Sequence, residues 1–182
     1  MSFVRFLLLG ALAATFLSAN TPDRVIELYA DGDFRSACLE GARILRDSKD
    51  DETFVNAYGI ACLKSDFIDL AAPAVMYLRS TSGARQNASY ILTVVLQKKL
   101  LYHALADNVD LQGAFLPKTP HVLSKVYNAF ASGDYTQKGA TLYEMRIDGK
   151  RITLDSLHDG GHFKIRIRQY EGNRVAKEHL YW

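Results

Sequence analysis

The spacing of apolar residues changes once along this chain, and that change most constrains the fold. From about Thr21 to Ser132, apolar residues recur every three or four positions, which is typical of amphipathic helices. From Thr141 onward they alternate with polar residues, which is typical of half-buried strands. The sequence therefore predicts an α+β protein, with an N-terminal array of antiparallel helices followed by a small four-stranded antiparallel β-sheet.

The first 19 residues predict a segment that is removed on export. Arg5 is followed by an uncharged run from Phe6 to Leu17, which suits a signal-peptide core and is too short for a membrane span of about 20 residues. Ser18 and Ala19 supply small side chains for cleavage after Ala19. The alternative is a retained anchor or a buried helix. Export predicts a periplasmic location in a bacterium and the secretory lumen or beyond in a eukaryote.

The rest of the chain divides into a helical domain over residues 20–138 and a β module over residues 139–182. Thr21 and Pro22 predict the first helix start. Further helices are expected over 33–48, through Cys62, over 69–80, from Ala84 to Ala106 with an interruption at Lys98 and Lys99, and after Pro120.

Similar turns recur along the helical domain. Four small, polar or aromatic triplets begin 33, 34 and 34 positions apart: Gly32-Asp33-Phe34, Ser65-Asp66-Phe67, Lys99-Leu100-Leu101 and Gly133-Asp134-Tyr135. With this period, the region from about Asn20 to Asp134 resembles tetratricopeptide-like repeats, whose unit is a pair of antiparallel helices. The alternative is a non-repetitive all-α domain with evenly spaced turns.

The resemblance implies a curved inner surface that binds peptides or partner proteins. By the spacing of that family, the residues facing the surface are expected to be Tyr29, Ser89, Thr93, Gln97 and Tyr127. The alternative for each is an ordinary place in the helical core.

The two cysteines, Cys38 and Cys62, are equidistant from a predicted turn at residues 49–51. In an antiparallel helix pair such residues lie level, about 18 Å from the turn at 1.5 Å per residue. In an oxidising compartment we expect a disulfide between them. The alternatives are two buried free thiols and, less favoured, a redox-active pair.

In the β module, Lys164, Arg166 and Arg168 alternate with apolar residues and form a basic strand face. Such a face has two interpretations: a contact for an acidic partner, or a solvated sheet face partly neutralised by nearby carboxylates. His158 and His162 are the only pair in the module with the character of metal ligands, and they lack the further ligands that a site requires.

We found no catalytic or cofactor motif, and we expect no enzymatic activity and no cofactor. The formal charge is +2, and it falls to +1 when Arg5 leaves with residues 1–19, so nucleic-acid binding is not expected. No later stretch is long and apolar enough for a membrane span. The leading hypothesis is an exported, non-enzymatic adaptor or scaffold that binds a protein partner of the cell envelope, with no prediction of its oligomeric state. The alternative is a metal- or ligand-binding periplasmic module centred on His158 and His162.

Overall fold

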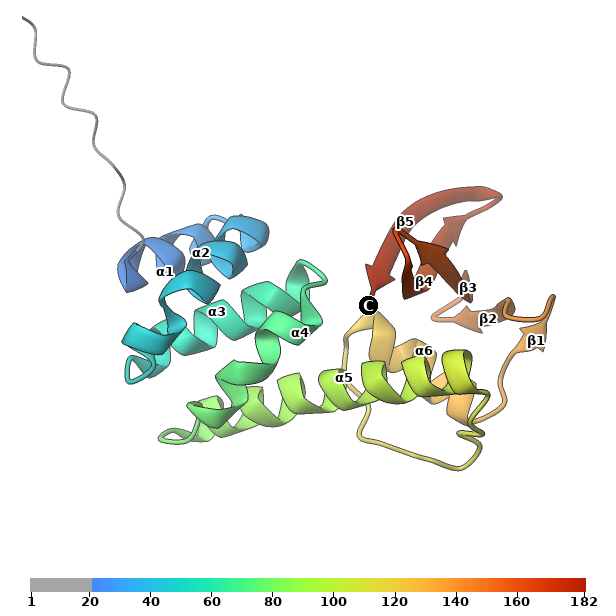
Figure 1. Ribbon diagram of the computed structural model, residues 1–182, viewed down its shortest axis with the longest axis horizontal. Coiled ribbons are helices and arrows are strands. Elements are labelled where there is room, and N and C mark those ends of the chain that lie inside the picture. The colour runs from blue at the N-terminus through green and yellow to red at the C-terminus, as the bar shows by residue number, and fades with distance from the viewer. Residues whose placement is uncertain (1–20) are drawn as a thin grey trace, which may run out of the picture.

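The computed structural model describes residues 21–182, so the predicted signal peptide lies outside the described residues. Six α-helices and one short 3-10 helix precede the sheet in this part of the chain (Figure 1). They are α1 (Pro22–Ala30), α2 (Phe34–Ser48), α3 (Glu52–Lys64), α4 (Ile68–Ala71), η1 (Ala72–Met76), α5 (Ser82–Asp107) and α6 (Val122–Ala131).

Side chains cap most of these helices at their first turn. Thr21 Oγ1 accepts a hydrogen bond from the Arg24 N–H, which confirms the predicted start of α1. Asp33 and Asp51 cap α2 and α3 in the same way. Local residues therefore fix where these three helices begin.

Two helix predictions are wrong. The helix expected over 69–80 is only α4 followed by the 3-10 helix η1, because Pro73 lacks an N–H and sits at the start of η1. The interruption expected at Lys98 and Lys99 does not exist, since α5 is continuous over 26 residues. Lys98 points inward and finds a carboxylate partner in Asp69, so its charge does not end the helix.

The sheet has five strands rather than the four predicted. In spatial order they are β1 (Thr136–Gln137), β2 (Tyr143–Ile147), β3 (Lys150–Asp159), β4 (His162–Glu171) and β5 (Arg174–Tyr181), all antiparallel. The extra strand, β1, has only two residues, too few for any alternation to appear in the sequence. Asp148 and Gly149 form the predicted tight turn, with φ values of 51° and 75°.

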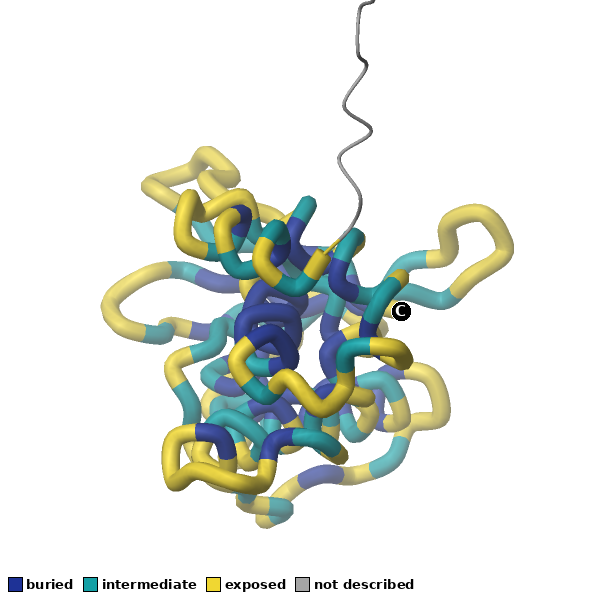
Figure 2. Tube along the Cα trace, turned by 90° about the vertical axis from the view of Figure 1, so that its left-hand side faces the viewer, coloured by how far each residue is buried: buried dark blue, intermediate teal, exposed yellow. Residues whose placement is uncertain are grey.

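One hydrophobic core runs from the helices into the sheet. Buried residues of α1–α6 and of β2–β5 belong to a single cluster, and strands of the sheet contact α5 and α6. Figure 2 shows the buried segments at the centre and the exposed ones in the projecting loops. Within residues 21–182, no helix has the length and apolarity that a membrane crossing requires. The tetratricopeptide-like repeat remains a prediction.

Candidate functional site

Three helices end in the same hydrogen-bonded turn. After α1, α3 and α6 a residue in the left-handed conformation follows, at Gly32 (φ 81°), Asp66 (φ 67°) and Gly133 (φ 74°). In each turn the next N–H donates to a carbonyl five residues back, as in Phe67 N to Cys62 O at 2.9 Å. This is the Schellman arrangement, in which glycine is the usual residue. Asp66 therefore occupies a position that glycine holds in the other two turns.

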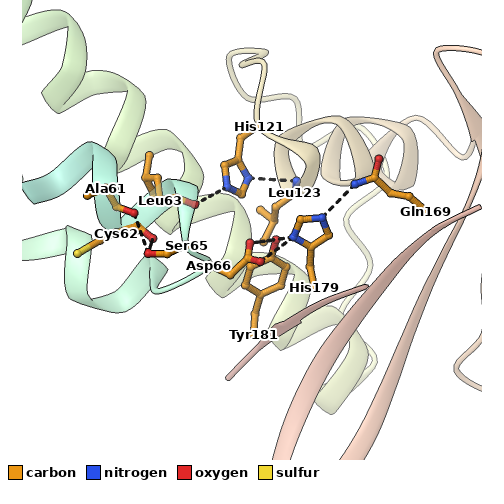
Figure 3. A network of polar contacts seen from close by, with 10 residues as sticks. All are labelled: Ala61, Cys62, Leu63, Ser65, Asp66, His121, Leu123, Gln169, His179 and Tyr181. Carbon is orange, nitrogen blue, oxygen red and sulfur yellow. Dashed lines mark hydrogen bonds and ion pairs between the residues drawn. The ribbon is translucent and has the colours of Figure 1, made fainter. Parts of the chain in front are cut away.

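The contacts of its carboxylate explain why an aspartate, and not a glycine, stands at position 66. This carboxylate accepts a hydrogen bond from His179 Nδ1 at 2.8 Å and one from the Tyr181 hydroxyl at 3.0 Å. His179 and Tyr181 are two residues apart on β5, so both side chains lie on the same face of the strand. Both are buried, and Figure 3 shows them converging on Asp66. The α3–α4 turn thus holds the end of β5.

The imidazole of His179 is hydrogen-bonded at both nitrogens. The Gln169 amide nitrogen donates to His179 Nε2 at 3.0 Å, which leaves the proton on Nδ1 for Asp66. Burial, the charge of Asp66 and the hydrogen bond to it raise the pKa of Tyr181 well above its usual value, so its hydroxyl stays a donor.

A second histidine joins the same turn to α6. The Leu123 N–H donates to His121 Nδ1 at 3.2 Å, so the ring caps α6 in its neutral form. Its other nitrogen, Nε2, then carries the proton and lies 3.2 Å from Leu63 O at the end of α3 (Figure 3). Burial lowers the pKa of His121 and opposes protonation.

Lys98 provides a second link to the end of the chain described. Its side chain is 3% exposed, and its ammonium donates to Asp69 Oδ2 at 2.6 Å and to the main-chain oxygen of Trp182. Burial lowers the pKa of Lys98, and the Asp69 carboxylate opposes that shift. Lys99 also reaches Asp69, at 3.2 Å.

A cleft of about 250 Å³ opens beside these contacts. Its main walls are Phe67, Ile68, Leu70, Lys98, Tyr181 and Trp182. Leu70 is 37% exposed and Trp182 is 57% exposed, so apolar surface remains open to solvent at the mouth of the cleft. The charged groups of Asp69 and Lys98 are already paired with each other.

The polar side chains beside this cleft are hydrogen-bonded within the protein. Both nitrogens of His179 and the hydroxyl of Tyr181 are committed to protein groups. General acid–base work needs a titrating group within reach of the substrate. The arrangement combines polar groups that are hydrogen-bonded within the protein with an apolar opening.

The predicted cysteine pair lies in the contact between α2 and α3 and does not line this cleft. The sulfur atoms of Cys38 and Cys62 lie 2.06 Å apart, at bonding distance, and both residues are fully buried. The prediction that the two cysteines meet is confirmed. The pair is compatible with an oxidising compartment.

The five residues predicted to face a partner do not form one surface. Gln97 and Tyr127 are fully buried, so no partner reaches them. Gln97 donates to Pro117 O and the Tyr127 hydroxyl to Ala114 O, because the loop after α5 covers them. The hydroxyls of Ser89 and Thr93 donate to main-chain oxygens four residues back on the exposed side of α5, and Tyr29 is half-buried against Phe34.

The basic strand face is an ion-pair ladder and not a free cationic surface. Arg166 binds Asp155 through two hydrogen bonds of 2.9 and 2.7 Å, and Arg168 contacts the same carboxylate at 3.2 Å. Lys164 contacts Asp159 at 2.7 Å. The solvated-face interpretation accounts for these contacts.

His158 and His162 cannot share a metal ion as placed here. His158 lies opposite Phe163 and His162 lies opposite Asp159, so the two histidines point to opposite faces of the β3–β4 hairpin. Across residues 21–182, no three His, Cys, Asp or Glu side chains lie close enough to hold a metal ion. The weak metal-ligand candidates His158 and His162 are therefore not brought together, and the alternative of a ligand-binding module stays a prediction.

The sequence reasoning missed Asp66, His179 and Lys98. No sequence pattern pointed to Asp66, because the recurring triplets align it with Asp33 and Asp134, and only the φ values place it at the glycine position. Comparison of this chain with protein-family models, with curated proteins and with solved structures finds no match.

Proposed function

We propose that this protein is an exported, non-enzymatic interaction module of the cell envelope. In this proposal, the cleft between α4 and Trp182 receives one apolar side chain of a protein partner. The observation that carries it is the open apolar mouth formed by Leu70 and Trp182 beside a fully paired polar support.

The size and charge of the cleft favour this kind of ligand. Pockets for drug-sized molecules and cofactors usually measure about 300 to 1,000 Å³, whereas this cleft measures about 250 Å³. Asp69 is already paired with both Lys98 and Lys99, and Lys98 also donates to the main-chain oxygen of Trp182, so a charged ligand gains no unpaired partner from Asp69 or Lys98. Exposed aromatic side chains such as Trp182 often dominate the binding energy of protein interfaces.

Site-specific photocrosslinking tests the proposal in the native envelope. A photoreactive phenylalanine analogue replaces Leu70 in one variant and Leu39 of α2 in a matched control, since both leucines are 37% exposed. We expect a discrete adduct from position 70 only, with the crosslinked partner residue in an apolar segment.

Trp182→Ala in the Leu70 variant supplies the second control. This change removes the indole but keeps the main-chain oxygen that Lys98 binds. The adduct should fall by roughly tenfold if the indole contributes as a central interface aromatic. Equal adducts from positions 39 and 70, or an adduct insensitive to Trp182→Ala, would contradict the proposal.

A further inference from the structure

A second cavity lies where the C-terminal ends of α5 and α6 meet β1 and β2. It measures about 260 Å³ and shares no lining residue with the cleft beside Trp182. In Figure 1 the end of α5 and strands β1 and β2 lie together at the right. Its side-chain walls include Asn108, Asp110, Gln112, Phe130, Tyr135 and Tyr143.

Three aromatic rings form one wall of this cavity. Phe130 and Tyr135 stack with centroids 5.1 Å apart, and Tyr143 meets both edge-on at 5.0 and 5.1 Å. Gly133 makes this possible, because its left-handed conformation ends α6 and turns the chain back toward Phe130. Phe130 covers one face of the Tyr135 ring, yet Tyr135 is 37% exposed. An aromatic surface is therefore available to a ligand.

The polar groups of the cavity are largely uncommitted. The hydroxyls of Tyr135 and Tyr143 and the carboxamides of Asn108 and Gln112 form no side-chain hydrogen bond with any residue in 21–182. Asp110 Oδ1 accepts from the Gln112 N–H, which leaves Oδ2 free for another donor. Burial, together with the nearby Tyr135, raises the pKa of Tyr143, so its hydroxyl remains a donor at neutral pH.

The helix ends add a negative potential, because the C-terminal end of a helix carries partial negative charge. The last carbonyls of α6 add no open acceptors, since the N–H groups of Ser132, Asp134, Gly133 and Gly113 already donate to them. Two helices, α5 and α6, end at this cavity, and Asp110 adds a carboxylate. Phosphates and carboxylates are therefore disfavoured, whereas hydroxyl donors are favoured.

We propose that this cavity binds a neutral pyranose ring of a glycan. A sugar ring presents a flat C–H face, which packs on an aromatic ring, and hydroxyls that both donate and accept. The exposed part of Tyr135 packs against that C–H face. The carboxamides of Asn108 and Gln112, the two tyrosine hydroxyls and the Asp110 carboxylate pair with the sugar hydroxyls. This site is independent of the proposed partner cleft.

Titration calorimetry of the purified protein tests the site with two probes, maltotriose and the trisaccharide of N-acetylglucosamine. We expect saturable binding of at least one probe, with a Kd of about 1 mM or tighter. Tyr135→Ala should weaken it by at least about tenfold, because the stacking surface is lost.

Asn108→Gly provides a variant that preserves the fold. Asn108 is left-handed, with φ 56°, so glycine keeps the backbone while the carboxamide is removed, and we expect binding about threefold to tenfold weaker. The matched control is Phe115→Ala, which removes a 69% exposed aromatic side chain outside the cavity and should leave binding unchanged.

Three outcomes would overturn the proposal. One is the absence of saturable binding by both sugars up to about 20 mM, well above the expected Kd. Another is binding of choline or inorganic phosphate in place of the sugars. The third is sugar binding that neither Tyr135→Ala nor Asn108→Gly weakens.

Discussion

The contact between α2 and α3 and the contact between the α3–α4 turn and β5 use opposite chemistry. The first is apolar and covalent, through Cys38 and Cys62. The second is polar, and Asp66 there receives hydrogen bonds from His179 and Tyr181. Only three residues separate Cys62 from Asp66, so both contacts meet at one helix end.

Because one contact is covalent and the other is hydrogen-bonded, different treatments should weaken them. A disulfide responds to reductant and is indifferent to protonation near neutral pH. A buried polar contact depends on every partner being present, because an unpaired buried group costs more than the bond itself contributes. The helix pair and the junction with β5 should therefore fail under different conditions.

Removing the disulfide should have the largest effect. Cys38→Ala with Cys62→Ala opens a crosslink with a sequence separation of 24, and we expect the free energy of unfolding to fall by about 3 to 4 kcal/mol. Urea denaturation measures the change. Reductant should destabilise the parent protein by a similar amount and leave the double variant unaffected.

Thiol titration checks the premise directly. Denatured, unreduced protein should contain no reactive thiol from Cys38 or Cys62. Two thiols per chain would show that the pair is a buried dithiol, and the contrast between the two contacts would then disappear.

Removing the Asp66 carboxylate should have the next largest effect. Asp66→Gly suits the left-handed turn but leaves the Nδ1–H of His179 and the hydroxyl of Tyr181 without their partner. We expect a loss of about 2 to 3 kcal/mol in urea denaturation.

Asp148→Gly is the matched control for that variant. Asp148 is also left-handed, with φ 51°, but its carboxylate pairs at the surface with Lys125. Its substitution should change stability by less than about 1 kcal/mol. Equal effects at both positions would mean that the Asp66 contact stabilises no more than an ordinary surface pair.

The sequence predicted the helix starts and the β-hairpin turns because those features depend on neighbouring residues. Thr21 bonds three residues ahead, and Asp148 with Gly149 forms its turn locally. The repeat resemblance predicted evenly spaced turns, one of them next to Lys98. It could not show that this position lies in the interior of α5. The partner of that lysine, Asp69, lies 29 positions away, and the charge alone gave no sign of burial.

The candidate site could not be predicted because its residues are distant in the sequence. Asp66 and His179 are 113 positions apart, and no local pattern relates a turn to the last strand. The burial of Gln97 and Tyr127 could not be predicted for the same reason. Gln97 and Tyr127 have helical spacing that fits an exposed face, but the loop after α5 folds over them.

Protonation of His121 should change the free energy of unfolding least of the three perturbations. It tests the comparison because the polar junction, and not the disulfide, should respond to pH. His121 caps α6 only when Nδ1 is unprotonated. Burial lowers its pKa in the folded protein, while the unfolded chain has an ordinary pKa near about 6.5. Below that pH the unfolded state binds more protons than the folded state, so stability falls as pH decreases toward the folded pKa.

His121→Asn isolates this contribution, because asparagine caps helices without titrating near neutral pH. Between pH 8 and pH 5.5 the parent should lose about 1 kcal/mol more than the variant in urea denaturation. His162→Asn, at an exposed position, controls for general effects of losing a histidine. Asp66, His179 and Lys177 also act on the His121 ring, so their charges are kept unchanged in both variants. An identical pH dependence in the parent and His121→Asn would show that protonation of this ring does not weaken the junction.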